Sequence, residues 1–159
     1  RYFNPIGAHP SGLLGEAISK KISNIMPHIL NVALRKVSHL DIYGNDYNTK
    51  DGTGVRDYIH IMDLVDGHIA ALLNLDKQNG HNVFNLGTGK GISVLELVKA
   101  FEGVSSQEIP YQFTEKRKGD LSISYADPSK AYKELGWKAK KGLIEMCEDA
   151  FRWACNEKN

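Results

Sequence analysis

The chain has 159 residues, the length of one domain or of about half of a two-domain enzyme. Hydrophobic residues make up 42% and charged residues 25%, the ordinary range of a globular protein. The net charge of +1 excludes a global basic field for nucleic acid, so any anion must be held by local groups. Since no apolar run approaches roughly 18 residues and no leader opens the chain, we expect a soluble, cytoplasmic protein without membrane contact.

The first 75 residues predict two helices separated by loops and a strand. Residues 1–16 are rich in Gly and Pro and predict a strand end that runs into a long loop. Apolar residues at helical spacing predict helices over 24–40 and 63–75. A polar loop over 44–56 leads into 57–61, which alternates like a strand. The two expected apolar faces comprise Ile29, Leu30, Ala33, Leu34 and Val37, and then Leu64, Val65, Ile69, Leu72 and Leu73.

The central part of the chain predicts short strands around a helix. Residues 82–86 form a short apolar strand pattern. Ser93 and Glu96 have the spacing of a capping box and predict that a helix begins there. Residues 109–114 predict an edge strand, because Pro110 cannot donate to a central ladder.

Two further helices are expected near the end of the chain. Asp127 followed by Pro128 predicts a capped helix start, and Gly136 predicts its end. The last helix begins at about Leu143, and its apolar face comprises Leu143, Met146, Ala150, Phe151 and Ala154. The expected fold class is mixed α/β, with too few strands for a complete doubly wound sheet.

The cysteines and histidines predict neither a disulfide nor a metal site. Cys147 and Cys155 lie in one predicted helix, about 12 Å apart along its axis, which is too far for a disulfide. We expect both to be small core residues in a reducing compartment. The six histidines are scattered and lack the spacing of metal ligands.

The sequence GTGKG at 87–91 invites a phosphate-loop interpretation but departs from both known templates. The dinucleotide fingerprint needs a small residue where Ile92 stands. The Walker form needs Ser or Thr after the lysine, where Gly91 stands, and a glycine where Phe84 stands. We therefore predict a tight structural turn. No serine lies in a G-x-S-x-G elbow, so a hydrolase nucleophile is not indicated.

Two of the five arginines lie in Gly-bearing loops, Arg56 in DGTGVRDY and Arg117 in EKRKGDL. A guanidinium offers a planar fork that suits phosphate oxygens, and a neighbouring glycine permits close approach of a ligand. Asp120 could accept hydrogen bonds from ribose hydroxyls. From this chemistry alone, an anion site and two solvated surface arginines both remain open.

Several longer motifs resemble one family over nearly the whole chain. They are RYFNPIGAHPSG, NIMP, YGNDYNTKDGTGVRDYIHIMDLVDGHIAAL, FNLGTGKGISV, RKGDLSISYADPSKAYKELGW and MCEDAFRW. Together they resemble the C-terminal half of the UDP-glucose 4-epimerases, within the extended short-chain dehydrogenase/reductase family. The run GNDYNTKDGTGVRDYIH is specific, since related dehydratases and decarboxylases share only its R-D-Y/F-x-H/Y part.

The resemblance implies a fold and a division of labour. Residues 1–159 would form the UDP-sugar-binding C-terminal portion of an extended Rossmann-type fold, without the main dinucleotide-binding sheet. The chain begins at Arg1 rather than Met, so we expect a piece of a longer protein. The family's Gly-rich fingerprint and its Ser…Tyr-x-x-x-Lys catalytic set belong to the preceding NAD-binding half. We therefore name no catalytic residue in this chain.

The resemblance also implies roles for individual residues. Phe3 would abut the nicotinamide side of NAD, and Asn4 would contact the sugar diphosphate. Asn24 and Ile25 match residues that bind the diphosphate through side chain and backbone. Asp120 matches the carboxylate that holds the ribose.

The remaining implied contacts concern the base and the phosphates. Asp41, Ile42 and Tyr43 match a strand that lies along the uracil, and Tyr43 matches its stacking aromatic. Arg56 and Arg117 match the residues that grip the two phosphates.

The implied activity is that of an isomerase with NAD as cofactor. NAD takes hydride from C4 of the hexose while a tyrosine removes the hydroxyl proton; the 4-keto sugar rotates, and hydride returns to its other face. We expect the fragment alone to be inactive and the full-length enzyme to be a homodimer in galactose metabolism. Two alternatives stay open: a non-catalytic nucleotide-sugar-binding module, and another sugar-nucleotide dehydratase or decarboxylase.

Two departures from the family pattern stand out. The segment 17–25 reads AISKKISNI, with lysines at 20 and 21 and Ser23 in place of an asparagine, in a loop that folds over the substrate in the family. The lysines could attract phosphate or simply be solvated. Ser124 stands where a bulky tyrosine accompanies rejection of N-acetylated sugars, so we expect that UDP-GlcNAc and UDP-GalNAc are also interconverted.

Overall fold

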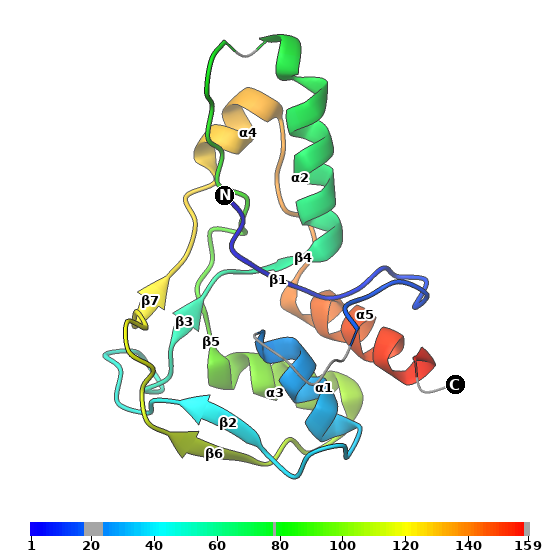
Figure 1. Ribbon diagram of the computed structural model, residues 1–159, viewed down its shortest axis with the longest axis vertical. Coiled ribbons are helices and arrows are strands. Elements are labelled where there is room, and N and C mark those ends of the chain that lie inside the picture. Colours follow the sequence, from blue (N-terminus) through cyan, green and yellow to red (C-terminus); the bar gives the residue numbers. More distant parts are fainter. Residues whose placement is uncertain (18–23, 78, 158–159) are drawn as a thin grey trace.

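The computed structural model describes residues 1–17, 24–77 and 79–157, which form two regions joined by short strands (Figure 1). We call the first region the base. It contains three helices and a strand pair, namely α1 (Ile25–Ala33), α3 (Val94–Ser105), α5 (Leu143–Asn156), β2 (Leu40–Tyr43) and β6 (Tyr111–Thr114). We call the second region the arm. It contains α2 (Ile61–Leu73), α4 (Ser129–Leu135) and the segment 79–86 beside them.

The strands are short and form three separate ladders. In the base, β2 pairs in parallel with β6. Between base and arm, β1 (Asn4–Ile6) pairs in parallel with β4 (Tyr58–His60). A three-stranded ladder places β3 (Val55–Arg56) between antiparallel β5 (Ile92–Ser93) and parallel β7 (Ile123–Ser124). The described residues thus form a mixed α/β fold without a doubly wound sheet, as the sequence predicts.

The base encloses the larger hydrophobic core. Leu97 and Phe101 of α3 are fully buried, and Met146 of α5 is 1% exposed. The rings of Phe101 and Phe151 meet edge to face, with centroids 5.7 Å apart. The predicted apolar face of α5 is confirmed, since its five residues are buried or packed against this core.

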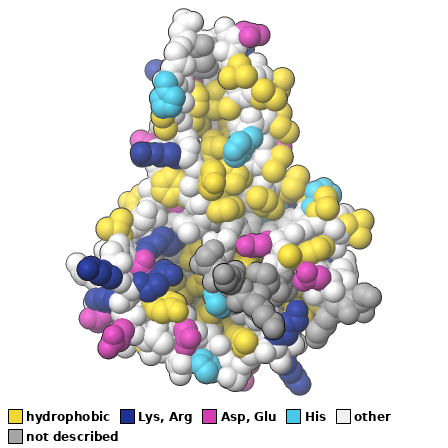
Figure 2. All heavy atoms as spheres, in the orientation of Figure 1, with side chains coloured by type: hydrophobic (Ala, Val, Ile, Leu, Met, Phe, Trp, Pro, Cys, Tyr) yellow, Lys and Arg dark blue, Asp and Glu magenta, His cyan; other side chains and the backbone are white. Residues whose placement is uncertain are grey.

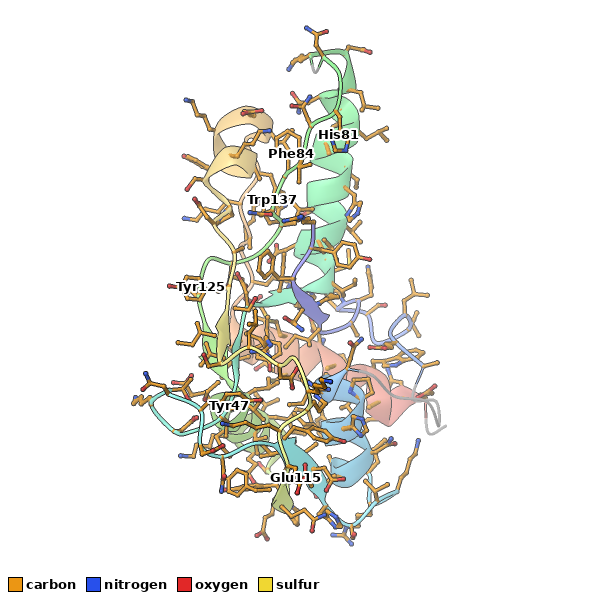
Figure 3. All side chains as sticks on the ribbon, turned by 60° about the vertical axis from the view of Figure 1, so that its left-hand side comes forward. Tyr47, His81, Phe84, Glu115, Tyr125 and Trp137 are labelled. Atoms are coloured by element: carbon orange, nitrogen blue, oxygen red, sulfur yellow. The ribbon has the colours of Figure 1, made fainter. Side chains whose placement is uncertain are left out.

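The arm has a smaller core between α2 and α4. Trp137 is buried there, and its indole N–H donates to the Asp63 carbonyl at 3.0 Å. Figure 3 shows Trp137 and Phe84 between the two helices, and both belong to or pack against this cluster. The helix predicted over 63–75 is confirmed as α2, but among its apolar residues Leu64 is buried while Ile69 and Leu72 are 48% and 65% exposed.

The helix ends follow the predicted capping chemistry closely. Ser93 and Glu96 form the capping box of α3, with backbone-to-side-chain bonds of 3.0 and 2.9 Å. Gly136 ends α4 in the left-handed region at φ 64°. Asp127 accepts from the Ser129 N–H at 3.0 Å, although α4 begins one residue later than predicted, at Ser129.

The helix predicted over 24–40 ends early, at Ala33. Arg35 adopts a positive φ of 57°, and the backbone N–H groups of Lys36 and Val37 both donate to the Asn31 carbonyl. This turn reverses the chain before β2. Val37, which the helical spacing placed with Ile29 and Leu30, lies beyond the helix and is exposed.

Two predicted strands change in extent. The strand predicted over 57–61 is β4, which ends at His60, because His60 caps the start of α2. Segment 82–86 forms no strand in the described structure. In this segment only Leu86 forms a β-bridge, to Tyr2. Residues 82–85 have no regular secondary structure.

The two cysteines differ in environment. Both thiols are free; Cys147 is buried in the base and Cys155 is exposed. The expectation that both are core residues is therefore wrong for Cys155, because α5 turns that position outward. Burial raises the pKa of the Cys147 thiol to about 12. Among the described helices, none is long and apolar enough to cross a membrane.

Candidate functional site: an arginine-lined cavity on the base

A cavity of about 300 Å³ lies where β1, α1 and β2 meet Arg56 of β3 and the loop that carries Arg117. Nine of the ten substrate-binding residues expected from the sequence line it. Those nine are Asn4, Asn24, Ile25, Asp41, Ile42, Tyr43, Arg56, Arg117 and Asp120. The structure thus brings together residues that are up to 116 positions apart, 120 − 4, along the chain.

The two arginines share one carboxylate. Arg117 Nε donates to Asp120 Oδ2 at 2.8 Å, and Arg56 Nη2 lies 3.9 Å from Asp120 Oδ1. Arg56 is further fixed because its Nη1 donates to the carbonyls of Val55 and Leu121. Two guanidinium groups beside one carboxylate suit a bound anion, and Asp41 adds a second carboxylate to the cavity lining. Arg56 is 20% exposed and is held in the cavity wall, whereas the Arg117 side chain is 56% exposed at its edge.

An aromatic face lies beside the arginines. The Arg117 guanidinium carbon is 4.8 Å from the ring centroid of Tyr43, a cation–π distance. Tyr43 is the last residue of β2 and is 43% exposed, so its ring is accessible from the cavity side. A planar base can stack on such a ring while the arginines contact attached phosphates.

Two loops that close the cavity are fastened to each other. Lys116 forms an ion pair with Asp46 at 2.7 Å and lies 4.5 Å from the ring centroid of Tyr47. A Cβ on Gly44, whose φ is 82°, would meet the Tyr47 ring at 2.6 Å, so only glycine fits this close approach. Figure 3 shows Tyr47 on the base near the strand pair. The fastened loops hold Arg117, the next residue, at the cavity.

The cavity also contains residues that the sequence interpretation missed. Tyr58 lines it two residues after Arg56, and His28 lines it four residues after Asn24. Residues two apart in a strand, and four apart in a helix, lie on the same face. The sequence therefore contained a signal for both Tyr58 and His28. Burial raises the pKa of the Tyr58 phenol above its usual value, so the phenol is a hydrogen-bond donor at neutral pH. Tyr47 and Val94 gave no such signal.

Two expected site residues lie outside the cavity. Ser124 is in register with Arg56 in the β3–β7 ladder, so both side chains point to the same face, with Ser124 beyond the cavity edge. Phe3 precedes β1, and its backbone N–H donates to the Leu86 carbonyl. Lys20, Lys21 and Ser23 of the variant loop lie outside the described residues.

No group of three His, Cys, Asp or Glu side chains in the described ranges is placed to hold a metal ion. The turn at 87–91 forms as predicted, but its N–H groups at Thr88 and Gly89 donate to the Asp57 carboxylate. A buried side chain already occupies the place where a phosphate would bind. The residues of this turn therefore do not fit the pyrophosphate of a dinucleotide.

Comparisons with known families and proteins agree on the family of this chain. A sequence model of the family described as GDP-mannose 4,6 dehydratase matches residues 1–150. UDP-glucose 4-epimerase of Bacillus subtilis is 55% identical over 159 residues, which is 100% of this chain and 47% of that protein. The chain thus spans about half the length of the curated relatives that it matches.

Solved structures agree with the sequence relatives. A UDP-glucose-4-epimerase from Stenotrophomonas maltophila, with bound NAD and formylated UDP-arabinopyranose, has a TM-score of 0.95 at 46% identity, covering 99% of this chain and 47% of that one. The UDP-glucose 4-epimerase from Bifidobacterium longum, in complex with NAD+ and UDP, has a TM-score of 0.94 at 49% identity, covering 100% and 47%. The chain therefore belongs to the family described as GDP-mannose 4,6 dehydratase, and the expected resemblance to the C-terminal half of the UDP-glucose 4-epimerases is confirmed.

Proposed function

We propose that this chain is the UDP-sugar-binding part of an NAD-dependent enzyme that interconverts UDP-glucose and UDP-galactose. The observation that carries the proposal is the single cavity in which Arg56, Arg117 and Asp120 lie beside the exposed ring of Tyr43. The relatives named as UDP-glucose 4-epimerases, one of them in complex with NAD+ and UDP, support it.

The proposed roles follow from the chemistry of the lining. The ring of Tyr43 stacks on the uracil, with Asp41 and Ile42 of the same strand along its edge. Arg56 and Arg117 bind the diphosphate by charge-assisted hydrogen bonds. On binding, Asp120 exchanges part of its arginine contacts for the ribose hydroxyls.

Other contacts hold the junction between the diphosphate and the sugar. Asn4 and Asn24 supply amide donors there, and Ile25 supplies backbone at the start of α1. The phenol of Tyr58, which also lines the cavity, supplies one more donor. UDP is thus held on several sides by this chain.

The hexose is held less tightly than UDP, because the cavity lining ends short of Ser124. Epimerisation at C4 needs both faces of the hexose to reach the same reacting group, so a loose hold on the sugar is useful. NAD, when bound, supplies hydride acceptance and return. Since the 87–91 turn does not fit its pyrophosphate, we propose that NAD and the acid–base groups are held by a part of the protein outside this chain, with Phe3 beside the nicotinamide.

A chimeric enzyme tests the proposal. In the Bacillus subtilis epimerase, the part aligned with this chain is replaced by residues 1–159, and conversion of UDP-galactose to UDP-glucose is measured with NAD present. We expect activity within about tenfold of the parent enzyme. Arg56→Ala in the chimera should raise the KM about 10- to 100-fold, the loss of hydrogen bonds to a charged group. A folded, NAD-loaded chimera that converts no UDP-galactose would contradict the proposal.

The alternatives predict other outcomes of the same experiment. A non-catalytic binding module gives a chimera that binds UDP by calorimetry but turns nothing over. A dehydratase or decarboxylase is indicated if the coding sequence before Arg1 resembles those enzymes and the full-length product has lost water or CO2. A Gly-rich fingerprint with Tyr-x-x-x-Lys there, and an epimeric product, support the epimerase.

We further propose that Ser124 admits N-acetylated sugars, since a small side chain leaves room beside Arg56 on the same face. The chimera should convert UDP-GlcNAc as well as UDP-glucose. Ser124→Tyr should remove the first activity and keep the second. No turnover of UDP-GlcNAc under conditions where UDP-glucose reacts would show the proposal to be wrong.

A further inference from the structure

Asp57 is a fully buried carboxylate between Arg56 of β3 and Tyr58 of β4. Its partners in the described part of the chain are N–H and O–H donors from two distant segments. Oδ1 accepts from the Thr88 N–H at 2.8 Å and from the Thr88 hydroxyl at 2.6 Å. Oδ2 accepts from the Gly89 N–H at 2.9 Å and from the Ala126 N–H at 3.1 Å. One carboxylate thus joins the 87–91 turn to the segment that follows β7.

The surroundings of Asp57 are built closely around a carboxylate. A Cβ on Gly87 would lie 2.6 Å from both Asp57 Oδ2 and the Ala126 Cβ, so a glycine is needed at this contact. An ionised carboxylate only accepts hydrogen bonds, whereas an asparagine amide would point two N–H donors at other donors. The arrangement therefore depends on two acceptor oxygens and not only on the shape of the side chain.

Three segments that carry site residues meet at Asp57. Its carbonyl accepts from the Asn4 N–H at 3.0 Å. Arg56 precedes it, and Ser124 pairs with Arg56 in register two residues before Ala126. The Asp57 carboxylate therefore fixes the backbone at Ala126, two residues after Ser124.

Arg56 does not depend on the Asp57 side chain in the same way. Its strand pairs on both sides, with β5 and with β7. Its guanidinium has separate bonds to the Val55 and Leu121 carbonyls. Losing the carboxylate should therefore release the Ala126 end of the ladder while Arg56 stays in place.

We propose that Asp57 is a positioning residue that sets Ser124 at the hexose end of the site, independently of the arginines at the diphosphate end. This inference rests on the proposed function. It assigns the 87–91 turn a role: the turn packs against Ala126, and the two together enclose the carboxylate. The expected signature is a separation of sugar recognition from UDP recognition.

Asp57→Asn in the chimeric enzyme tests the proposal. We expect the KM for UDP-GlcNAc, whose N-acetyl group would lie beside Ser124, to rise about 10- to 100-fold, the effect of misplacing a substrate contact by about 1 Å. The Ki of UDP, a competitive inhibitor that lacks the hexose, should change by less than about twofold. A variant that is only less stable would lose folded enzyme and leave KM and Ki alone. Parallel changes in KM and Ki, or none in a folded variant, would overturn the proposal.

Two further variants keep the test open if Asp57→Asn does not fold. Gly87→Ala pushes on Ala126 while the carboxylate remains, and it should give the same separation of KM from Ki. Thr88→Val removes only the hydroxyl donor and should give the same separation to a smaller extent. If the folded variants among these show no separation, Asp57 has no positioning role.

Asp51→Asn is the matched control. Asp51 is also a carboxylate that accepts several donors, from the Thr53 N–H, the Thr53 hydroxyl and the Ser93 hydroxyl, but it joins the loop before β3 to α3. We expect its variant to lower stability without separating KM from Ki. An inactive chimera with the native residues would contradict the proposed function itself, which distinguishes that failure from a failure of this inference.

Discussion

The base and the arm have similar helical sequence patterns but complete their cores to different extents. In the base, α3 and α5 pack their apolar faces against each other, and Leu97 and Phe101 are fully buried. In the arm, α2 packs only one side, against Leu86 and Trp137, and its other side stays open. Apolar spacing therefore identifies a helix, whereas burial is decided by what packs on it.

The two regions are joined by buried polar contacts. His60 caps α2 by accepting the Met62 N–H at Nδ1, and its Nε2 lies 3.1 Å from Asp149 of α5. Asp63 of α2 accepts from the N–H groups of Lys140 and Lys141, which lead into α5. Asn4 and Tyr58 of the β1–β4 ladder line the arginine-lined cavity, and the same ladder ends at His60 in this junction.

The largest difference between the two regions should appear in their cores. Leu97→Ala in α3 should lower the free energy of unfolding by about 4 kcal/mol, because the fully enclosed site cannot collapse around the lost volume. Leu64→Ala in α2 makes the same change in a helix and should cost about 2 kcal/mol, since the arm can relax. Urea unfolding of both variants checks this. Equal losses would show that the arm core is as complete as the base core.

Breaking the junction should have the next largest effect. Asp149→Ala leaves the buried His60 N–H and the Arg152 guanidinium without their shared acceptor and should cost about 3 kcal/mol. Glu148→Ala, an exposed neighbour on the same helix, should stay within about 0.5 kcal/mol of the parent. Thermal unfolding followed by tryptophan fluorescence and by circular dichroism gives the comparison. A loss as small as that of the control would mean that the junction does not couple the regions.

The same junction should make stability depend on pH. Burial lowers the pKa of the His60 imidazole below its usual value, against the Asp149 and Asp63 carboxylates, which raise it, while Lys141 lowers it further. The unfolded chain then binds a proton that the folded chain does not. The stability from neutral His60 is complete above about pH 6.5 and is lost as the pH falls through the lowered pKa.

Urea midpoints at about pH 7.5 and about pH 5.5 measure this dependence. The parent chain should be less stable at the lower pH, and His60→Gln should flatten the difference. The carboxyl groups of Asp51 and Glu145 also have lowered pKa values, but their contribution to stability is lost only at lower pH. An unchanged slope in His60→Gln would assign the pH dependence to a different group.

How much the sequence could predict differs between these features. The capping box at Ser93 and the end of α4 at Gly136 were predicted correctly, because their chemistry is contained in a few adjacent residues. The strand at 82–86 was not, because pairing needs a neighbour, and the described chain offers one only at Leu86. Local rules therefore succeeded where the cause was local.

The cavity shows the same limit. Arg56 and Arg117 were candidates from their Gly-bearing loops, and Asp120 lies only three residues after Arg117, but the approach of Arg56 to Asp120 and of Arg117 to the Tyr43 ring comes from the fold. Tyr47 gave no signal in the sequence, since its place depends on the contact of two loops through Lys116. Asp57 was seen as part of a strand, and its role as acceptor for two distant segments depends on contacts 31 and 69 residues away.

The open side of α2 gives the smallest expected effect on stability. Hydrophobic side chains gather over the arm in Figure 2, and Ile69, Leu72 and Leu73 of α2 are 48%, 65% and 76% exposed. Contiguous exposed apolar surface of this kind promotes dye binding and association. Leu72→Lys keeps a good helix former at an exposed position, so it should change the free energy of unfolding by less than about 0.5 kcal/mol.

The same variant should nevertheless change how the chain behaves in solution. Leu72→Lys should reduce binding of the dye ANS and any concentration-dependent association seen by size-exclusion chromatography. Asp66→Asn adds the same unit of positive charge on α2 without removing apolar surface, and it should leave both measurements unchanged. If the two variants behave alike, charge and not the open apolar side of α2 controls association, and the contrast between arm and base is confined to their cores.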